Sequence, residues 1–193
     1  MPLHDIEIMS PVGSYESLMA AIQGGAGSVY FGVGKLNMRA RSSVNFTLDD
    51  LAKITRICRQ FNVKSYLTMN TVIFDHEIEE VHRTIDAAKH HGVTAIIASD
   101  LSVLEYASGQ GVEIHISTQC NITNISAVKF YSRYADVMVT ARELTLDQVA
   151  AITHQIREQN IRGPKGELIK IEIFVHGALC MAVSGKCYLS LHN

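Results

Sequence analysis

The sequence of 193 residues predicts an α/β protein that folds as a (β/α) barrel. Short β-branched apolar runs alternate seven times with amphipathic segments of helical period, which is typical of parallel strands covered by helices. No G-x-G-x-x-G follows the first apolar run, where residues 10–17 read SPVGSYES, so the doubly wound dinucleotide-binding fold is disfavoured. The apolar content of 47% is that of a globular domain with its own core.

Seven segments have the length and composition of strands, and six have the spacing of amphipathic helices. In the second helical segment, for example, apolar side chains recur at Leu48, Leu51, Ile54, Ile57 and Cys58. The predicted strands are 6–10, 28–33, 63–69, 94–99, 112–117, 136–141 and 170–175. The predicted helices are 14–25, 47–62, 77–92, 101–110, 124–134 and 145–160.

The ends of these helices carry capping signals. Ser14 and Thr47 are each followed three residues later by a polar side chain that can cap in return, and Thr145 precedes Asp and Gln in the same way. Gly92 and Gly111 stand where two helical patterns stop. The alternation of elements is therefore marked by local signals as well as by hydrophobic period.

A closed barrel of this kind has eight strands, and the sequence shows seven. We therefore predict an incomplete or distorted TIM-type (β/α) barrel that forms a single domain over residues 1–193. The sequence ends in YLSLHN without a further helical pattern. We expect this domain to be the N-terminal part of a longer protein.

Charge and hydropathy narrow the class of protein. Lys and Arg number 17 and Asp and Glu 19, which gives a net charge of −2 and excludes the strongly basic field of a non-specific nucleic-acid binder. No apolar run approaches the ~18 residues that a membrane span needs, and the start MPLHDIEIMS lacks the pattern of a secretory signal. We expect a cytoplasmic protein without membrane contact, whose four cysteines are free or liganded.

Polar side chains gather where the predicted strands end, which is the catalytic face of a barrel. Amides, carboxylates, a guanidinium and imidazoles converge there, with thiols nearby. This composition predicts a pocket for an anionic ligand close to redox-capable sulfur. The catalytic candidates are Asn70, Asp100, His115, Gln119 and His176, and the further rim candidates are Asn121, Arg142 and Glu143.

Several candidates have a simpler structural alternative. Asn70, Asp100 and Asn121 can serve as turn or helix-cap residues. His115 alternates with isoleucines, so it can be a hydrogen-bonded histidine inside the barrel as well as a catalytic group.

Two arginines precede the second predicted helix. Arg39 and Arg41 share one side of an extended segment, where they can clamp a carboxylate or a phosphate, and the alternative is a solvated loop. Cys58 lies on the apolar face of a predicted helix and is expected in the core.

The stretch EIFVHGALCMAVSGKCYLS, residues 172–190, contains two cysteines with six residues between them, Cys180 and Cys187. That spacing is too long for a typical zinc knuckle, and a disulfide is disfavoured in the cytoplasm. His176 can act as the base of a nucleophilic Cys180. An iron–sulfur cluster usually takes four thiolates, of which this stretch supplies two, with Cys120 as a third candidate. The spacing alone does not decide between these alternatives.

The same stretch resembles the signature of peptidase family U32, the collagenase-like proteases. That signature requires Glu, Phe, Gly, a small residue, an aliphatic residue, Cys, Gly, Cys, an aliphatic residue and Ser at set intervals, and residues 172–190 satisfy every fixed position. The resemblance extends over essentially the whole chain. Further similar segments are SPVGSYESLMAAIQGGAGSVYFG, MRARSSVNFTLDDL, HISTQCNITN and ARELTLDQV.

The resemblance implies a TIM-like barrel and two kinds of activity. Some members are named collagenases. Others hydroxylate pyrimidines of tRNA or ribosomal RNA, with prephenate implicated, or hydroxylate ubiquinone precursors without oxygen. In those relatives cysteines bind a 4Fe-4S cluster, and by position Cys180 and Cys187 match its first two ligands. The remaining ligands, and further domains that could contact RNA, are expected beyond Asn193.

The residues favour a hydroxylase over a protease. The sequence holds neither G-x-S-x-G nor H-E-x-x-H, and His176 with Cys180 is the one nucleophile–base pair that it suggests. Arg39, Arg41 and Arg142 are candidates for holding a dicarboxylate such as prephenate, or a phosphate, with Glu143 beside them. A non-catalytic scaffold subunit is the third alternative.

Overall fold

The computed structural model describes residues 6–38, 46–177 and 182–186, and within these ranges seven parallel strands form one sheet. The strands follow one another in chain order across the sheet, without the reversal that marks a doubly wound fold. They are β1 (Met9–Pro11), β2 (Ser28–Gly32), β3 (Lys64–Met69), β4 (Ala95–Ala98), β5 (Ile114–Ile116), β6 (Val137–Val139) and β7 (Lys170–Glu172).

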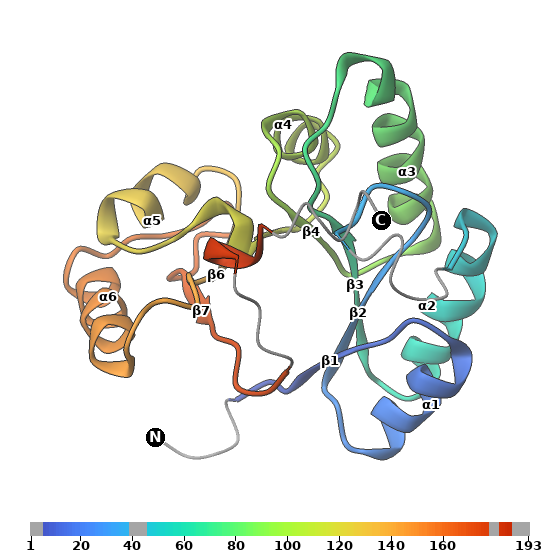
Figure 1. Ribbon diagram of the computed structural model, residues 1–193, viewed down its shortest axis with the longest axis horizontal. Coiled ribbons are helices and arrows are strands. Elements are labelled where there is room, and N and C mark those ends of the chain that lie inside the picture. Colours follow the sequence, from blue (N-terminus) through green and yellow to red (C-terminus); the bar gives the residue numbers. More distant parts are fainter. Residues whose placement is uncertain (1–5, 39–45, 178–181, 187–193) are drawn as a thin grey trace.

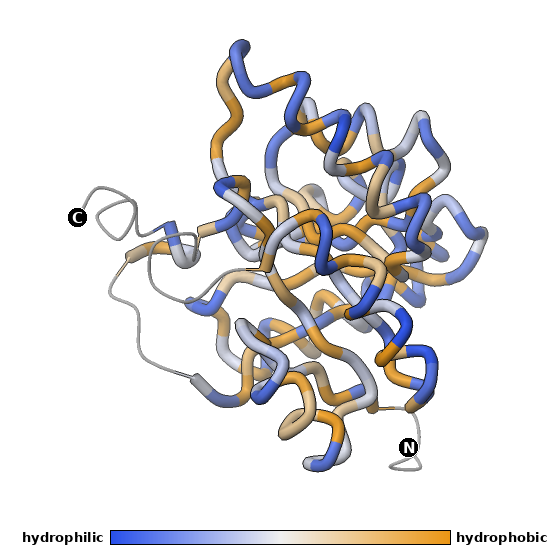
Figure 2. The backbone as a smooth tube through the Cα atoms, turned by 90° about the vertical axis from the view of Figure 1, so that its right-hand side faces the viewer, coloured by the Kyte–Doolittle hydropathy of each residue, from blue (hydrophilic) through white to orange (hydrophobic). Residues whose placement is uncertain are grey.

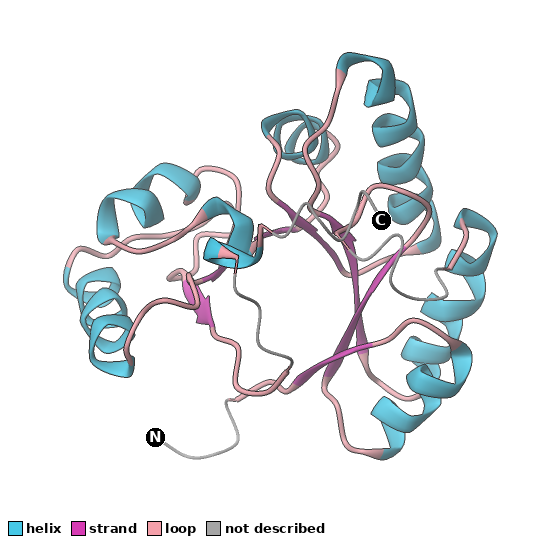
Figure 3. Cartoon of the chain, viewed as in Figure 1, coloured by secondary structure: helices cyan, strands magenta, loops and turns pink. Residues whose placement is uncertain are grey.

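Six α-helices connect these strands within the described ranges, and all of them lie on the outer, convex side of the sheet (Figures 1 and 3). The sheet curls into a half-barrel whose edge strands, β1 and β7, share no ladder among the described residues. The prediction of an incomplete TIM-type barrel with seven strands is confirmed. The helices are α1 (Tyr15–Gln23), α2 (Leu51–Gln60), α3 (Ile78–His91), α4 (Leu101–Gly109), α5 (Ile125–Tyr131) and α6 (Leu146–Glu158).

The helix ends follow the predicted capping signals. Ser14 and Thr145 each form a capping box at the start of α1 and α6, and the Thr47 N–H donates to Asp50 Oδ2 at 2.8 Å. Gly92 ends α3 in the left-handed conformation, with φ of 72°. None of the helices in the described ranges has the length and apolar character needed to cross a membrane.

The main hydrophobic core lies between the sheet and the helices. Outward-facing strand residues such as Leu67 and Ile96 pack in one cluster with helix residues such as Ile54 and Ile85, all fully buried. Each such side chain contributes roughly 1.5–3 kcal/mol by leaving water. Along the helices, hydrophilic and hydrophobic residues alternate, as expected where one face is buried (Figure 2).

The inside of the half-barrel holds a second, smaller cluster that consists of Tyr66, Ala95 and Ile97. In most barrels of this type, bulky branched residues fill the interior. Here charged and polar side chains share it, as described below. The interior of this barrel is thus polar enough to hold titratable groups.

The last strand is shorter than predicted. The sequence indicates a strand over 170–175, but β7 ends at Glu172, and Ile173, Phe174 and Val175 are exposed. β7 pairs with β6 on one side, and no strand in the described ranges pairs with its other side. β7 is therefore an edge strand in the described ranges, and edge strands are often short.

Candidate functional site

Two of the predicted residues meet in an amide cluster at the carboxyl ends of the strands. Asn70, after β3, donates through Nδ2 to Gln119 Oε1 at 3.2 Å and to Ser117 Oγ at 3.4 Å, both after β5. Asn70 Oδ1 accepts the N–H of Met38 at 3.2 Å, which ties the loop after β2 to the same point. Gln119 is 8% exposed, so these amides are held in a fixed orientation.

Ser117 is a member of this cluster that the sequence analysis missed. Its hydroxyl donates to Gln119 Oε1 and it is buried. The signal was present, because Ser117 lies two residues after His115 and therefore on the same inner face of its strand.

Asp100 acts as a helix cap in this structure. Its Oδ1 accepts hydrogen bonds from the backbone N–H of Ser102 at 2.9 Å and from the Ser102 hydroxyl at 2.7 Å, at the start of α4. Its Oδ2 accepts the N–H of Ile73 at 3.1 Å. Both oxygens are engaged, so the geometry favours the capping alternative over the predicted catalytic role.

A short 3-10 turn, η5 (Val183–Gly185), docks on the rim beside β5 and β6. The N–H of Ser184 donates to Glu143 Oε1 at 2.7 Å, and the Ser184 hydroxyl donates to Asn121 Oδ1. The hydrogen bond from the Ser184 backbone lowers the pKa of Glu143 below its usual value. Glu143, predicted to bind substrate, and Asn121 therefore hold the segment that links Cys180 to Cys187 in the sequence.

Arg142 lies beside this docked turn. Its guanidinium carbon is 4.4 Å from the centroid of the Phe174 ring, in a cation–π stack between the ends of β6 and β7. A Cβ at Gly185, where φ is +70°, would lie 3.2 Å from Arg142 Nη2, so the guanidinium also packs closely against this backbone. His176 is exposed, two residues beyond Phe174.

His115 lies inside the barrel and does not join the rim cluster. Its ring centroid is 4.6 Å from that of Tyr66, and its Nε2 is 3.5 Å from Glu113 Oε1, both toward the amino ends of the strands. His115 is 3% exposed, and its Nδ1 has no hydrogen-bond partner in the described part of the chain. The expectation that His115 shares the open mouth with Arg142 is corrected, because His115 sits two residues deeper than Ser117.

Carboxylates surround this interior. Glu7 Oε2 lies 2.5 Å from Lys64 Nζ, and its Oε1 accepts the Tyr66 hydroxyl at 2.6 Å. Burial alone would raise the pKa of Glu7, but these hydrogen bonds lower it. Hydrogen bonding from His115 and pairing with Lys165 lower the pKa of Glu113 to about 2.

Unlike Glu7 and Glu113, Glu172 has a pKa that its surroundings raise. Ile171 packs against the outer core, so its neighbour Glu172 points to the inner face of β7. Its carboxylate has no hydrogen-bond or ion-pair partner among the described residues, and burial together with the charge of Glu7 raises its pKa to about 7.

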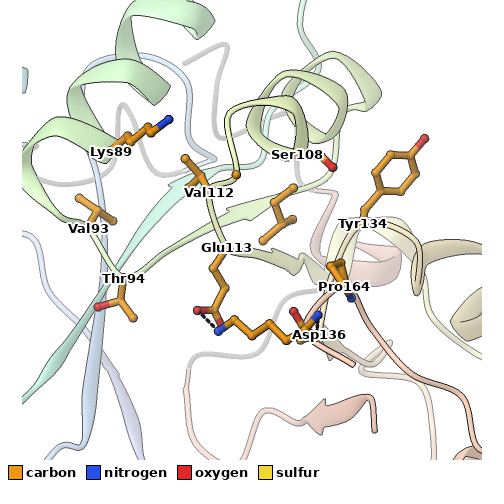
Figure 4. A pocket seen from close by; sticks show the side chains of 12 residues that line it. Lys89, Val93, Thr94, Ser108, Val112, Glu113, Tyr134, Asp136 and Pro164 are labelled. Atoms are coloured by element: carbon orange, nitrogen blue, oxygen red, sulfur yellow. Dashed lines mark hydrogen bonds and ion pairs between the residues drawn. The ribbon is translucent and has the colours of Figure 1, made fainter. Parts of the chain in front are cut away.

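A hollow of about 430 Å³ lies at the opposite, amino-terminal end of strands β4 to β7. Glu113 and Asp136 lie at its wall (Figure 4), and Glu113 Oε2 pairs with Lys165 Nζ at 2.5 Å. Asp136 Oδ1 accepts the N–H of Lys165 at 3.0 Å, which fixes the loop before β7. This end of a barrel serves stability rather than chemistry, so we assign the hollow a structural role.

Comparison with known proteins identifies the family. Residues 13–193 match peptidase family U32. The chain belongs to this family. It is 62% identical over its whole length to a collagenase of Porphyromonas gingivalis (strain ATCC BAA-308 / W83), of which it covers 47%.

Two further relatives have names that describe RNA modification. The chain is 36% identical over 97% of its length to the 23S rRNA 5-hydroxycytidine C2501 synthase of Escherichia coli (strain K12), of which it covers 27%. It is 29% identical over 96% of its length to tRNA hydroxylation protein P1 of Bacillus subtilis (strain 168), of which it covers 42%. The chain thus spans less than half the length of each of these curated relatives.

The structure of the U32 peptidase Mk0906 has the same fold. It superimposes with a TM-score of 0.66, covering 89% of this chain and 93% of that one, at 11% sequence identity. At that identity the similarity shows the fold alone.

Four predicted U32 site residues, Arg39, Arg41, Cys180 and Cys187, lie outside the described residues. Within the described ranges no three His, Cys, Asp or Glu side chains are grouped so that they could hold a metal ion. The predicted binding roles of these four residues therefore stay predictions.

Two cysteines lie within the described ranges. Cys58 is buried in the outer core as predicted, and burial raises the pKa of its thiol to about 11. Cys120 is partly buried after β5, where its thiol lies 3.5 Å from the carbonyl oxygen of Ser99, and burial raises its pKa. A raised pKa disfavours the thiolate, so the described environment activates neither thiol as a nucleophile.

Proposed function

We propose that this U32 protein hydroxylates pyrimidines of RNA, in tRNA or ribosomal RNA, with an iron–sulfur cluster that Cys180 and Cys187 help to bind. The observation that carries the proposal is the docked turn η5. Hydrogen bonds to Glu143 and Asn121 fix residues 182–186 at the carboxyl ends of the strands. The segment between the two signature cysteines is therefore built into the face where barrel enzymes carry their chemistry.

The cluster would need ligands beyond those two cysteines. A 4Fe-4S cluster takes four thiolates as a rule, and Cys58 is sealed in the outer core. Cys120 is the remaining thiol of the chain, and its partly buried position after β5 is compatible with a third ligand but not with a complete set. We therefore propose that the full protein supplies the missing ligands, and we route no reaction step through the cluster.

The described residues have roles in binding rather than in bond breaking. Asn70 and Gln119 offer a fixed pair of amides at the rim, suited to the polar edge of a base or to a carboxylate. Arg142, together with Arg39 and Arg41, is proposed to hold a dicarboxylate co-substrate such as prephenate, since guanidinium groups bind carboxylates bidentately.

Peptidase activity is the alternative, and the collagenase at 62% identity favours it. The described residues give it little support. Neither described cysteine has a histidine partner there, and the exposed His176 makes no hydrogen bond or ion pair with another described residue. A cysteine peptidase needs a thiol activated by a neighbouring base. A non-catalytic scaffold subunit is the remaining alternative.

The test is nucleoside analysis in a strain that lacks its own RNA pyrimidine hydroxylase. We expect the full protein to restore a hydroxylated pyrimidine in digested tRNA or ribosomal RNA, detected by mass spectrometry, and Cys180→Ser or Cys187→Ser to abolish it. Cys58→Ala is the matched control, because it removes a thiol from the core and leaves the rim intact. Cleavage of gelatin without any hydroxylated nucleoside would favour the peptidase alternative. The absence of activity in both assays would favour the scaffold alternative.

A further inference from the structure

The stack of Arg142 on Phe174 has the features of a binding surface. Phe174 is 45% exposed although it has a large apolar side chain, and the guanidinium carbon of Arg142 lies 4.4 Å from the centroid of its ring. Arg142 is also exposed, and no carboxylate of the described residues lies within ion-pair distance of it. A charged plane and an aromatic plane are thus presented together to solvent.

This stack is held in place by the surrounding backbone. Arg142 follows β6 and Phe174 follows β7, so both belong to the catalytic face of the barrel. On the side of η5, the backbone at Gly185 is close enough that an added Cβ would approach Arg142 Nη2 to 3.2 Å. A guanidinium fixed in this way loses little side-chain entropy when a ligand binds.

We propose that Arg142 and Phe174 form a stacking platform for an unpaired base of single-stranded RNA. This inference rests on the proposed function and names the part of the site that would hold the RNA. Proteins read single-stranded RNA by stacking its bases on aromatic rings and on guanidinium planes. Stacking needs no extended basic surface, which agrees with a net charge of −2.

The chemistry of the patch favours RNA over a protein partner. Ile173, Val175 and Val183 are also exposed near the stack, and such side chains could pack against another protein. An apolar protein interface would, however, bury the charge of Arg142, which has no carboxylate within ion-pair distance among the described residues, and this burial costs free energy. The phosphates next to a stacked base supply that counter-ion.

The chain contains a second stack of the same kind that serves as a matched control. Arg133 lies over Phe130 with 4.3 Å between its guanidinium carbon and the ring centroid, and Phe130 is 44% exposed. This pair lies at the C-terminal end of α5 on the outer layer, where Arg133, two residues beyond the helix, donates through Nε to the Phe130 carbonyl at 2.9 Å. The two stacks share an Arg–Phe pair and a similar exposure of the phenylalanine, while their positions in the fold differ.

The experiment uses the absence of tryptophan from the sequence. Phe174→Trp and Phe130→Trp each place a single indole in one of the two stacks of the full chain. Both proteins are titrated with a single-stranded pyrimidine-rich RNA oligonucleotide and with the same RNA in a duplex. We expect the single strand to quench the fluorescence of Phe174→Trp and to leave that of Phe130→Trp unchanged, with little effect of the duplex.

A second variant measures how much the platform contributes. Phe174→Ala removes an exposed ring, so the fold should be retained, and we expect RNA binding to weaken roughly five- to a hundred-fold, as for the loss of one stacked base. Phe130→Ala should bind RNA as the unmodified chain does. Circular dichroism and thermal unfolding verify that both variants remain folded.

Three results would overturn the inference. They are equal quenching of both tryptophans, unchanged affinity of Phe174→Ala, and the lack of any RNA binding by the chain. A concentration-dependent blue shift of Phe174→Trp without RNA would instead assign the patch to a second copy of the chain. Failure of the proposed function is distinguishable, because quenching without any hydroxylated nucleoside would leave the platform standing without the reaction.

Discussion

Glu172 is a residue whose chemistry depends on a neighbour far away in the sequence. It is the first residue of the family signature, and its side chain faces the barrel interior from β7. Its carboxylate is repelled by the charge of Glu7, which lies next to β1 at the other edge of the sheet. Glu7 already has Lys64 and Tyr66 as hydrogen-bond partners. Glu172 therefore bears the cost of burial and repulsion without a compensating cation among the described residues.

Replacing this carboxylate should change how stability depends on pH. The pKa of Glu172 is raised from 4.5 to about 7 in the folded chain, so the folded state holds a proton that the unfolded state releases between these values. This contribution to stability is fully present below pH 4.5 and is lost as the pH rises through about 7. We expect Glu172→Gln to be more stable than the unmodified chain at pH 8, by up to about 3 kcal/mol, and similar to it near pH 4.5.

Urea unfolding of both proteins across this pH range provides the measurement. The difference between the two curves isolates Glu172, because carboxylates with lowered pKa values, such as Glu113, contribute equally to both. Parallel curves from pH 4.5 to 8 would mean that the Glu172 carboxylate is solvated or paired with a cation.

Single residues also show where prediction from the sequence stops. Asn70 and Gln119 could be placed at the rim from their position after strands, and the structure brings them into contact. The proximity of Glu7 to Glu172 could not be predicted, since it depends on how far the sheet curls. The sequence left open whether His115 lies inside the barrel or at its mouth for a related reason: alternation predicts the face of a strand but not the distance from its end.

At the scale of elements, local signals determined most boundaries. Capping residues and a left-handed glycine marked helix ends correctly, because their hydrogen bonds are made within a few residues. The predicted end of the last strand, at residue 175, was wrong. A strand needs neighbours, and residues 173–175 have no ladder on either side in the described ranges. The docking of η5 was not predicted either, since Glu143 and Ser184 are 41 residues apart.

The loop before β7 offers a test of packing between elements. A Cβ on Gly163 would lie 2.4 Å from Asp136 Oδ1 and 2.9 Å from the carbonyl oxygen of Ala135, which is backbone and cannot move aside easily. We expect Gly163→Ala to lower the free energy of unfolding by roughly 1–3 kcal/mol, as overpacking does, measured by urea unfolding. Gly109→Ala is the control, since its Cβ would have no atom within 4 Å, and it should be neutral or slightly stabilising. Equal stability of the two variants would contradict the tight contact with Asp136.

The whole molecule is a sheet with a protected centre and two unequal edges. β4 and most of β3 are fully buried and pair on both sides, whereas β1 and β7 each pair on one side only in the described ranges. Both outer ends carry exposed apolar side chains, Ile6 and Ile8 before β1 and Val175 after β7. Exposed edges of this kind are sites where a sheet accepts a further strand or opens first.

Hydrogen exchange of the 193-residue chain should therefore follow position in the sheet rather than position in the sequence. We expect the amides of β3 and β4 to exchange slowest, with an opening free energy close to that of global unfolding, because their hydrogen bonds lie between buried layers. Protection should fall toward β1 on one side and toward β6 and β7 on the other, and mass spectrometry of peptic peptides resolves this gradient. β1 and β7 lie far apart in the sequence, but each forms an edge of the sheet in the described ranges. Similarly low protection of both strands would therefore be explained by the open edges of the barrel. Protection at β1 and β7 as strong as at β3 would contradict the open edges and would mean that another strand or another copy of the chain covers them.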